Sequence, residues 1–492
     1  MKSKALRLAL LLLVFVTGSV AGQDSLYTFS LQGLGGYTTP GMVPFWLRAN
    51  QFGSIPLDGA SLSLIGAARK DYDLSSDKLF DWGASFEGRA NLGQGSNLTL
   101  IEGYGKVRLG IFELRTGRSK KITGLCDTTL TSGSWPISGS NLGIPEIELS
   151  VRNFWPLPWF GQLFALKGNY SHGWVGEMPM NQYWADQIIS VKTYFHQKSI
   201  YGRLGKPSWK IELYAGINHQ TFWCMGDDYY PQDFDLSPLE NYYYIFSAKP
   251  LTNTSVQDEI LGNHVGSVDL GAEFILSRYK IFVYRQNIYE AGALKHLVYK
   301  QDGLNGISII NRKTQDKKYI WDKILFEFLY TKNQAGAVGS PDTASYDPYF
   351  NHWQYIEGWS YLSQGLGTSF INTRKHIRAE LATHPLDYFV NNRIKVYHFG
   401  VEGTIAQTKY VLVGSYSKNY GTYRTTDEEQ SAISSDPGAF GLFGEKKQFS
   451  GYLELDRRIK DNFKLGLVGA FDVGELYYNS YGVFLRAVYS LN

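Results

Sequence analysis

The sequence predicts an all-β fold, a transmembrane β-barrel of the outer-membrane type, from three observations. Only 19% of the 492 residues are Asp, Glu, Lys or Arg, against about 25% in soluble domains. Aromatic residues make up 15% of the chain and glycine supplies 52 positions, a composition typical of β-rich proteins. Apolar and polar residues also alternate along segments of about 10 residues, the length at which a tilted strand crosses a bilayer.

The N-terminus predicts export. Lys2, Lys4 and Arg7 flank an apolar run at 8–16, and small residues follow as far as Gly22, which is the layout of a secretory signal peptide. We expect residues 1–22 to be the signal peptide, with cleavage after Ala21 or Gly22, and residues 23–492 to form one barrel with its plug and loops. No cysteine follows the cleavage site, which disfavours a lipoprotein anchor. The mean hydropathy of -0.23 excludes a bundle of membrane-spanning helices.

Period-two alternation is strongest at 101–112, 146–152 and 209–218, and it recurs at 82–92, 268–276 and 464–472. A soluble sandwich would show the same alternation with its apolar face inside, so the barrel prediction depends also on the export signal, the low charge and the long strands. We expect one set of side chains to meet lipid: Ile101, Val107, Leu109, Ile211 and Leu213. We expect the opposite set to face the lumen: Glu102, Lys106, Arg108, Lys210 and Glu212. The last segment predicts a closing strand with a lipid-facing row of Tyr481, Val483, Leu485, Ala487, Tyr489 and Leu491.

Connections between the strands fall into two size classes. Short polar turns at 73–77 and 93–97 are expected at the periplasmic rim, where barrel hairpins are tight. Longer irregular stretches at 221–262, 331–352 and 415–448 are expected to be extracellular loops. The irregular segments 44–56 and 152–159 are predicted to pack as periplasmic or lumenal plugs.

Several segments together resemble one known family. They are PFWLRANQFGSIP at 44–56, YSHGW at 170–174, HQKSIYGRLGKPSWKIELYAGINHQ at 196–220, YRQNIYE at 284–290, DGLNGI at 302–307 and NHWQYIEGWSY at 351–361. In their order and spacing they resemble the Wzi family of capsule assembly outer-membrane proteins, in the branch found in Bacteroidetes. The resemblance covers essentially the whole mature chain.

The resemblance implies a barrel of about 18 antiparallel strands with short helices plugging the periplasmic end and loops folded over the outer mouth. Length alone would fit 14 or 16 strands equally well. The resemblance also implies a non-enzymatic, lectin-like protein of the cell outer membrane that binds capsular polysaccharide or exopolysaccharide. We expect a monomer surrounded by outer-membrane lipid.

Other classes of function have little support in the sequence. The net charge of +3 is spread without a basic block, so nucleic acid is not expected as a partner. Asn-His pairs at 218–219, 263–264 and 351–352 lack the spacing of a metal site, and no metal or other cofactor is expected. The acidic pairs Glu146 with Glu148 and Asp227 with Asp228 lie in no catalytic motif, and neither a G-x-S-x-G elbow nor a phosphate-binding loop is present, so we predict no enzyme. Cys126 and Cys224 permit one disulfide or two free thiols.

Clusters of aromatic and planar polar residues are the candidate polysaccharide-binding sites. Trp and Tyr rings stack on the C–H faces of sugars, while Arg, Gln, Asn and His bind hydroxyl and carboxylate groups. The candidates are His172, Trp174, Arg285, Gln286, Asn287, Tyr289, His352, Gln354, Tyr355 and Trp359. The alternative for these residues is the aromatic girdle of any membrane barrel, with Arg285 pairing across the lumen with Glu273 or Glu290.

Two further functions remain as alternatives to polysaccharide binding. The first is an outer-membrane porin or channel for oligosaccharides or other small solutes, with a lumen open to water. The second and weaker one is a surface-exposed hydrolase.

Overall fold

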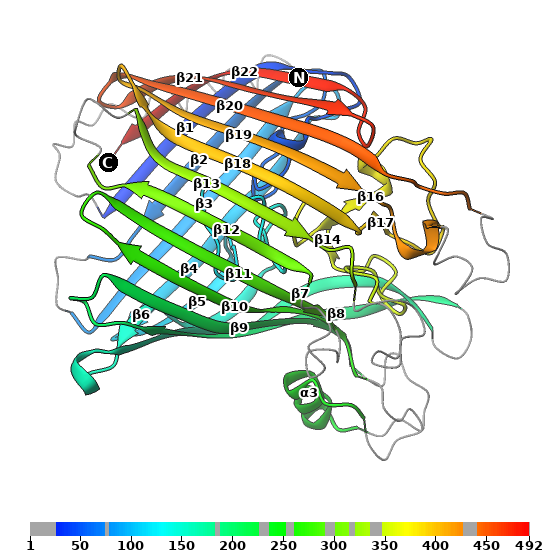
Figure 1. Cartoon of the computed structure of the whole chain (residues 1–492), viewed down its shortest axis with the longest axis horizontal. Helices are drawn as coiled ribbons and strands as arrows, with labels where there is room; N and C mark the ends of the chain where they lie inside the picture. Colours follow the sequence, from blue (N-terminus) through cyan, green and yellow to red (C-terminus); the bar gives the residue numbers. More distant parts are fainter. Residues whose placement is uncertain are drawn as a thin grey trace.

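A computed structural model describes residues 26–73, 78–182, 187–225, 236–251, 260–290, 301–313, 320–334, 347–426 and 440–491. The predicted signal peptide lies outside this part of the chain. Eighteen strands form one closed antiparallel sheet in which each strand pairs with its neighbours in sequence and β1 pairs with β22 (Figure 1). The barrel prediction and the count of 18 strands are therefore confirmed. The first nine strands are β1 (Tyr27–Thr38), β2 (Ala60–Lys70), β3 (Phe80–Leu92), β4 (Asn97–Leu109), β5 (Phe112–Arg118), β6 (Glu146–Pro156), β7 (Phe164–Asn181), β8 (Ile188–Leu204) and β9 (Ile211–Trp223).

The wall continues through nine more strands before it closes. They are β10 (Asn263–Ile275), β11 (Tyr279–Glu290), β12 (Gly303–Asn311), β13 (Trp321–Tyr330), β18 (Ile394–Ile405), β19 (Thr408–Asn419), β20 (Lys446–Lys460), β21 (Phe463–Gly474) and β22 (Ser480–Leu491). Two small hairpins lie within the 331–393 connection: β14 (Ser360–Tyr361) with β15 (Gln364–Gly365), and β16 (Asn372–Thr373) with β17 (Phe389–Asn391).

Helical structure is sparse in the described residues. Helix α3 (Pro238–Ser247) has a capping box between Ser237 and Glu240. Single 3₁₀ turns occur at η1 (Phe45–Leu47), η2 (Trp159–Gly161), η4 (Arg374–His376) and η5 (Tyr423–Thr425). No described helix has the length and apolar character needed to span a bilayer.

The alternating side chains sort largely as predicted. Val107, Leu109, Ile211 and Leu213 are exposed on the outer wall, as is Leu485 of β22 at 70% exposure. The expected lumenal residues Glu102, Lys106 and Glu212 are buried inside, and Arg108 shares their face of the barrel. An outer surface of this kind suits hydrocarbon, because only the lumenal face then has to hold charge.

One of the facing predictions is wrong. The β3–β4 pairing shifts register between Glu87 and Gly88, so that Ile101 is the extra residue of a β-bulge and is 1% exposed. A bulge turns the extra side chain to the face of the next residue, which places Ile101 beside Glu102. Lys210 lies just before β9, at the rim of the barrel, where it is exposed, so its lumenal facing stays a prediction.

The two ends of the barrel differ in their connections. At the short-turn end, where β1 begins and β22 ends, hairpins such as 110–111, 406–407 and 461–462 join the strands. The connections 224–262, 331–393 and 420–445 all lie at the other end, the long-loop end, which confirms that the three predicted loops share one side. The turn at 93–96 also lies at the long-loop end, so its predicted place among the periplasmic hairpins is wrong.

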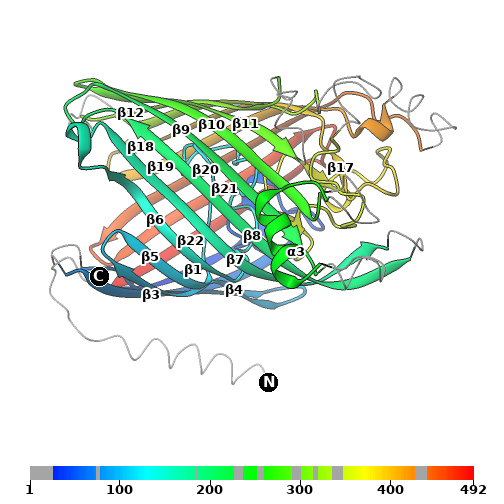
Figure 2. The same ribbon diagram turned by 90° about the horizontal axis from the view of Figure 1, so that it is seen from below.

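The lumen is filled from the long-loop end. Segment 39–59, segment 119–145 and the described part of 331–393 form the plug, and they fold inward from this end (Figures 1 and 2). Their rings pack into a buried core, with centroids 4.6 Å apart for Trp135 and Phe350 and 4.4 Å for Trp359 and Phe222 of β9. Segment 44–56 is thus a lumenal plug as predicted.

The other predicted plug and the cysteines have different outcomes. Segment 152–159 continues β6 and enters the η2 turn, where Trp159 is 64% exposed at the short-turn end, so it is not a plug. The described plug chain holds only 3₁₀ turns and two small hairpins and enters from the long-loop end, in place of the helices expected at the periplasmic end. Cys126 and Cys224 are free thiols.

Candidate binding site at the barrel mouth

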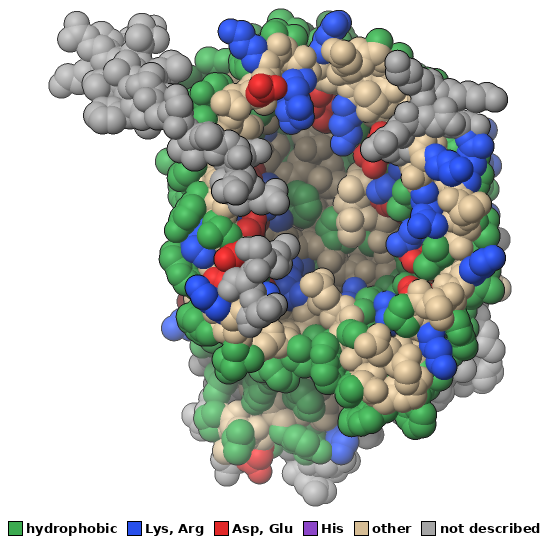
Figure 3. Space-filling view, turned by 90° about the vertical axis from the view of Figure 1, so that its left-hand side faces the viewer, with side chains coloured by type: hydrophobic (Ala, Val, Ile, Leu, Met, Phe, Trp, Pro, Cys, Tyr) green, Lys and Arg blue, Asp and Glu red, His purple; other side chains and the backbone are tan. Residues whose placement is uncertain are grey.

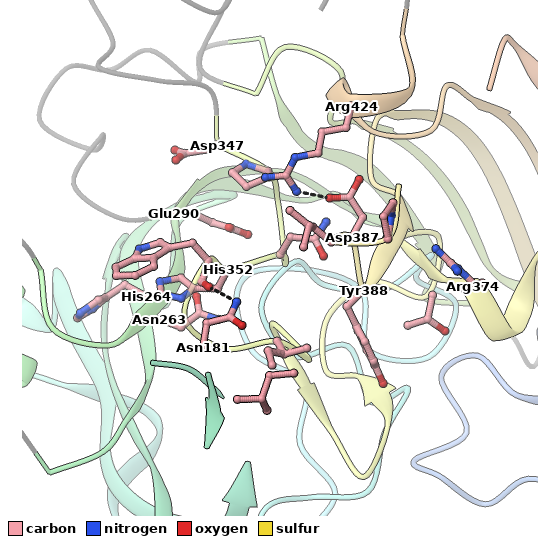
Figure 4. A pocket seen from close by; sticks show the side chains of 18 of the residues that line it. Asn181, Asn263, His264, Glu290, Asp347, His352, Arg374, Asp387, Tyr388 and Arg424 are labelled. Atoms are coloured by element: carbon pink, nitrogen blue, oxygen red, sulfur yellow. Dashed lines mark hydrogen bonds and ion pairs between the residues drawn. The ribbon is translucent and has the colours of Figure 1, made fainter. Parts of the chain in front are cut away.

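A cavity of about 1020 Å³ opens at the long-loop end, between the strand ends and the 347–388 chain (Figure 4). Strand ends supply Asn181 of β7, Asn263 and His264 of β10 and Glu290 of β11. Its other walls come from the plug and from the β19–β20 connection. They include Asp347, Asn351, His352, Trp353, Thr373, Arg374, Lys375, Leu386, Asp387, Tyr388 and Arg424.

Hydrogen bonds fix the chain around the cavity. Asn351 and Phe389 exchange two bonds of 2.8 Å, from the Asn351 Nδ2 to the Phe389 carbonyl and from the Phe389 N–H to the Asn351 Oδ1. The backbone N–H of Phe350 donates to Glu290 Oε1 at 2.9 Å. Gly358 takes a φ of +55°, and a Cβ there would lie 2.0 Å from the Phe350 carbonyl oxygen. The turn that brings this chain back over the mouth therefore requires glycine.

Charged groups lie on two sides of the cavity. Glu290 and Asp347 lie on the side of His264 and His352, and Arg374 lies on the opposite side (Figure 4). Asp387 is buried between them, with its Oδ1 2.7 Å from Arg424 Nη1 and its Oδ2 accepting from Thr422 Oγ1 at 2.6 Å. Such a cavity can bind hydroxyl groups on one side and a carboxylate on the other.

Burial shifts the pKa values of Asp347 and His352 at the mouth. Burial raises the pKa of Asp347 to about 7, and its Oδ2 is a buried atom without a hydrogen-bond partner among the residues that the structure describes. Burial lowers the pKa of His352 to about 3, so that the ring is neutral at pH 7. The His352 Nδ1 accepts from the backbone N–H groups of Gln354 at 3.2 Å and Tyr355 at 3.4 Å.

Aromatic surface suited to a sugar lies beside these groups. The Trp353 ring is 49% exposed and stacks on His352, with centroids 6.3 Å apart and planes at 22°. Its position is held by the Asn181 Nδ2, which donates to the Trp353 carbonyl at 2.9 Å. Among the residues that the structure describes, no group of three or more His, Cys, Asp or Glu could hold a metal ion. The mouth therefore offers stacking and hydrogen bonding, the two interactions by which proteins hold neutral and acidic sugars.

Of the ten residues predicted from the sequence, His352 lines this cavity. The other candidates of its segment lie behind the cavity surface. Gln354 and Tyr355 are buried, and the Trp359 Nε1 donates to the Pro136 carbonyl at 2.7 Å. These residues shape the mouth by holding the segment onto the plug.

The β11 candidates separate onto two faces. Gln286 points into the lumen, where its Oε1 accepts from the backbone N–H of Trp135 at 3.0 Å. Arg285 and Asn287 point outward, and Arg285 donates to Asn287 at 2.6 Å and to Asn305 at 2.7 Å. Tyr289 shares their face and donates to the Asn218 carbonyl at 3.1 Å.

The alternative pairing of Arg285 across the lumen with Glu273 or Glu290 is wrong. Arg285 lies on the opposite side of the wall, and Glu273 pairs with Lys280 at 2.8 Å.

His172 and Trp174 also lie on the outer wall. They face the same way on β7, next to helix α3, which packs outside the barrel against β7–β9 (Figure 2). The His172 ring lies 6.3 Å from Tyr242 of α3, and Trp174 is 46% exposed. Neither residue lines the mouth cavity.

Most of the mouth residues were not among the sequence candidates. Asp347, Arg374, Asp387 and Arg424 come from irregular chain in which no spacing marks a site. Two of the three Asn-His pairs noted in the sequence, at 263–264 and 351–352, line the mouth.

Comparisons with known proteins support the fold. No protein-family model and no curated protein matches the chain. Among solved structures, the chain is similar to Wzi of Escherichia coli, which is described as an outer-membrane, carbohydrate-binding β-barrel involved in group 1 capsule assembly. The TM-score is 0.54 and the identity 13%, and the match covers 94% of this chain and 83% of Wzi. It also matches OccK5 (OpdH) of Pseudomonas aeruginosa, with a TM-score of 0.44 and 10% identity over 94% of this chain and 98% of OccK5. A third match is an anion-selective porin from Comamonas acidovorans, with a TM-score of 0.37 and 9% identity over 94% of this chain and 98% of the porin.

The chain thus has the fold of an outer-membrane β-barrel. More specifically, it has a Wzi-like barrel fold. At 13% identity the likeness concerns the fold, and the Bacteroidetes branch stays a prediction.

Proposed function

We propose that this protein resides in the outer membrane and binds surface or capsular polysaccharide at the barrel mouth, without catalysis, to support capsule assembly or attachment. The observation that carries the proposal is the mouth cavity, which combines an exposed Trp353 ring with amide, carboxylate and guanidinium groups. Its volume is in the range of small-molecule sites, about 300–1,000 Å³. A short stretch of a polysaccharide chain fits such a space, with the remainder of the polymer outside the cell.

The packed plug supports binding over transport. Trp135, Tyr349 and Phe350 are fully buried in the lumen and contact one another as in a domain core. A lumen filled by such side chains offers a hydrated solute less room than the open lumen of a porin does. The Wzi structure is described as that of a carbohydrate-binding barrel, which agrees with this choice.

A porin is the second candidate, favoured by the hollow at the short-turn end. Figure 3 looks onto this end and shows a central depression with Lys, Arg, Asp and Glu side chains around its opening. A charged vestibule is typical of channels as well as of plugged barrels.

Two experiments on the full chain separate the candidates. Deletion of the gene should leave polysaccharide synthesis unchanged but shift the polymer from the cell-bound to the shed fraction, with complementation by the intact gene as control. In planar bilayers the purified barrel should give little conductance. Unchanged retention of polysaccharide together with large, steady conductance would overturn the binding proposal in favour of the porin.

A further inference from the structure

A second, smaller cavity lies inside the barrel, on the opposite side of the plug from the mouth. It has a volume of about 190 Å³ and is bounded by plug residues 121–124 and the lumenal faces of β6 to β9. Lys167, one of its wall residues, is the fourth residue of β7 from the short-turn end. The cavity therefore faces the short-turn end, where the barrel is hollowed (Figure 3).

Three buried polar atoms around this cavity have no hydrogen-bond partner among the described residues. They are Thr123 Oγ1 of the plug, Ser150 Oγ of β6 and Asn218 Nδ2 of β9. Asn218 is 0% exposed, and its Oδ1 already accepts from Gln220. Buried polar groups in folded proteins are nearly always hydrogen-bonded to protein, water or ligand. Each of the three can donate a hydrogen bond to an occupant of the cavity.

The cavity also holds an ammonium group that forms no ion pair with the described residues, although the buried carboxylate of Asp269 acts on it from beyond 4.0 Å. Its other cations are paired: Lys121 contacts Glu146 and Glu148, the latter at 2.7 Å, and Arg152 lies 3.0 Å from Glu113. Lys167 has no acidic group within 4.0 Å in the described part of the chain. Its Nζ instead lies 4.9 Å from the Phe154 ring centroid and 5.1 Å from that of Tyr201.

We propose that this inner cavity binds a small oxyanion, a carboxylate or a phosphate, between Lys167, Asn218 and the hydroxyl groups of Thr123 and Ser150. Water would satisfy the three polar atoms, whereas an oxyanion would satisfy them and would also give the half-buried Lys167 an ion-pair partner, which the described residues do not supply within 4.0 Å. The volume equals roughly six waters at about 30 Å³ each, which is also enough for one compact acidic group. This site is separate from the mouth cavity and does not depend on the polysaccharide proposal.

Calorimetric titration of the purified full-length barrel tests the proposal, with sodium glucuronate and inorganic phosphate as probes and glucose as the neutral control. We expect at least one anion to bind and glucose not to bind. Lys167→Met should weaken anion binding about ten-fold or more, because a charge-assisted hydrogen bond is lost. Lys210→Met removes an exposed lysine at the same end of the barrel and should change nothing.

A second variant covers the case in which Lys167→Met does not fold. Asn218→Asp places a carboxylate at the cavity and should abolish anion binding while leaving a folded barrel, as judged by heat-modifiable gel mobility. Binding of phosphate alone identifies inorganic phosphate as the source, and binding of glucuronate alone identifies a sugar acid; either result supports the site. The proposal is overturned if neither anion binds, if glucose binds equally well, or if folded Lys167 and Asn218 variants bind as the parent does. Trp353→Ala should leave this binding unchanged, which separates it from binding at the mouth.

Discussion

Gln286 on strand β11 and Trp135 in the plug are joined by a hydrogen bond of 3.0 Å, from the Trp135 backbone N–H to the Gln286 Oε1. Both residues are fully buried. The Gln286 Nε2 also donates to Ser134 Oγ at 3.1 Å. A lumenal side chain of the wall therefore satisfies the backbone of the plug, which has no sheet of its own at this point. The plug and the barrel form one packed unit through such contacts.

Gln286→Leu should loosen the plug and leave the barrel intact. The substitution leaves the buried Trp135 N–H without an acceptor, which costs roughly 1–3 kcal/mol. We expect normal heat-modifiable mobility but a rise in single-channel conductance in planar bilayers. Gln94→Leu, in the exposed turn between β3 and β4, is the matched control and should show the same conductance as the parent. Equal conductance in the two variants would show that this contact does not hold the plug.

The Asp347 carboxyl predicts a pH dependence of stability. Burial raises its pKa to about 7, against about 3.9 in an unfolded chain. The folded protein therefore binds more protons than the unfolded chain between those two values, and stability should fall as the pH rises through that window. Asp347→Asn should remove this contribution to the pH dependence of the free energy of unfolding, measured by urea unfolding in micelles. The variant should be more stable than the parent at pH 8 and no more stable at pH 4. The control Asp461→Asn, in the β20–β21 turn, should show the pH dependence of the parent. If Asp347→Asn also shows the pH dependence of the parent, the Asp347 carboxyl is not its cause.

A charged residue on the outer wall should destabilise the barrel more, the deeper it lies in the bilayer. Leu485 lies in the middle of β22 and is 70% exposed, whereas Leu98 lies at the rim end of β4 and is 82% exposed. In lipid vesicles we expect Leu485→Arg to lower the free energy of unfolding by about 2–4 kcal/mol and Leu98→Arg by about 0–1 kcal/mol. Equal costs at the two sites would contradict a lipid-facing wall.

Removing one partner of the Asp387–Arg424 ion pair should lower the stability of the protein more than removing both partners does. Asp387 is buried, and Arg424→Met leaves its carboxylate without a cation at 2.7 Å. We expect a clear loss of thermal stability for the single variant, of about 3 kcal/mol or less because Arg424 is partly exposed. The double variant Asp387→Asn with Arg424→Met should recover part of that loss. Additive losses in the double-mutant cycle would show that the two groups do not interact.

The sequence could predict the barrel because strand alternation is a local property. The outward row of β22 and the lumenal charges of β4 and β9 follow directly from period two. The inward facing of Ile101 could not be predicted in the same way. It results from a bulge in the pairing with β3, and this pairing cannot be read from the sequence of one strand. The strand count came from a resemblance and not from the length.

The site was predicted less well for a related reason. Arg285, Gln286 and Asn287 were grouped because they are adjacent in sequence, yet consecutive residues of a strand point to opposite faces, so Gln286 enters the lumen while its two neighbours face outward. Asp347, Asp387 and Arg424 meet at the mouth only through the fold of irregular chain. No periodic pattern in the sequence indicates that these residues lie close together.

Equilibrium binding of the source organism's purified surface polysaccharide to the detergent-solubilised barrel tests the central claim most directly. The parent protein should bind, and Trp353→Ala, which removes the exposed ring at the mouth, should weaken binding by roughly ten-fold or more, because the apolar contact between the ring and the sugar face is lost. Trp159→Ala, which removes a more exposed tryptophan at the short-turn end, should bind as the parent does. Absence of binding by the parent, or equal binding by Trp353→Ala and Trp159→Ala, would contradict a polysaccharide site at the barrel mouth.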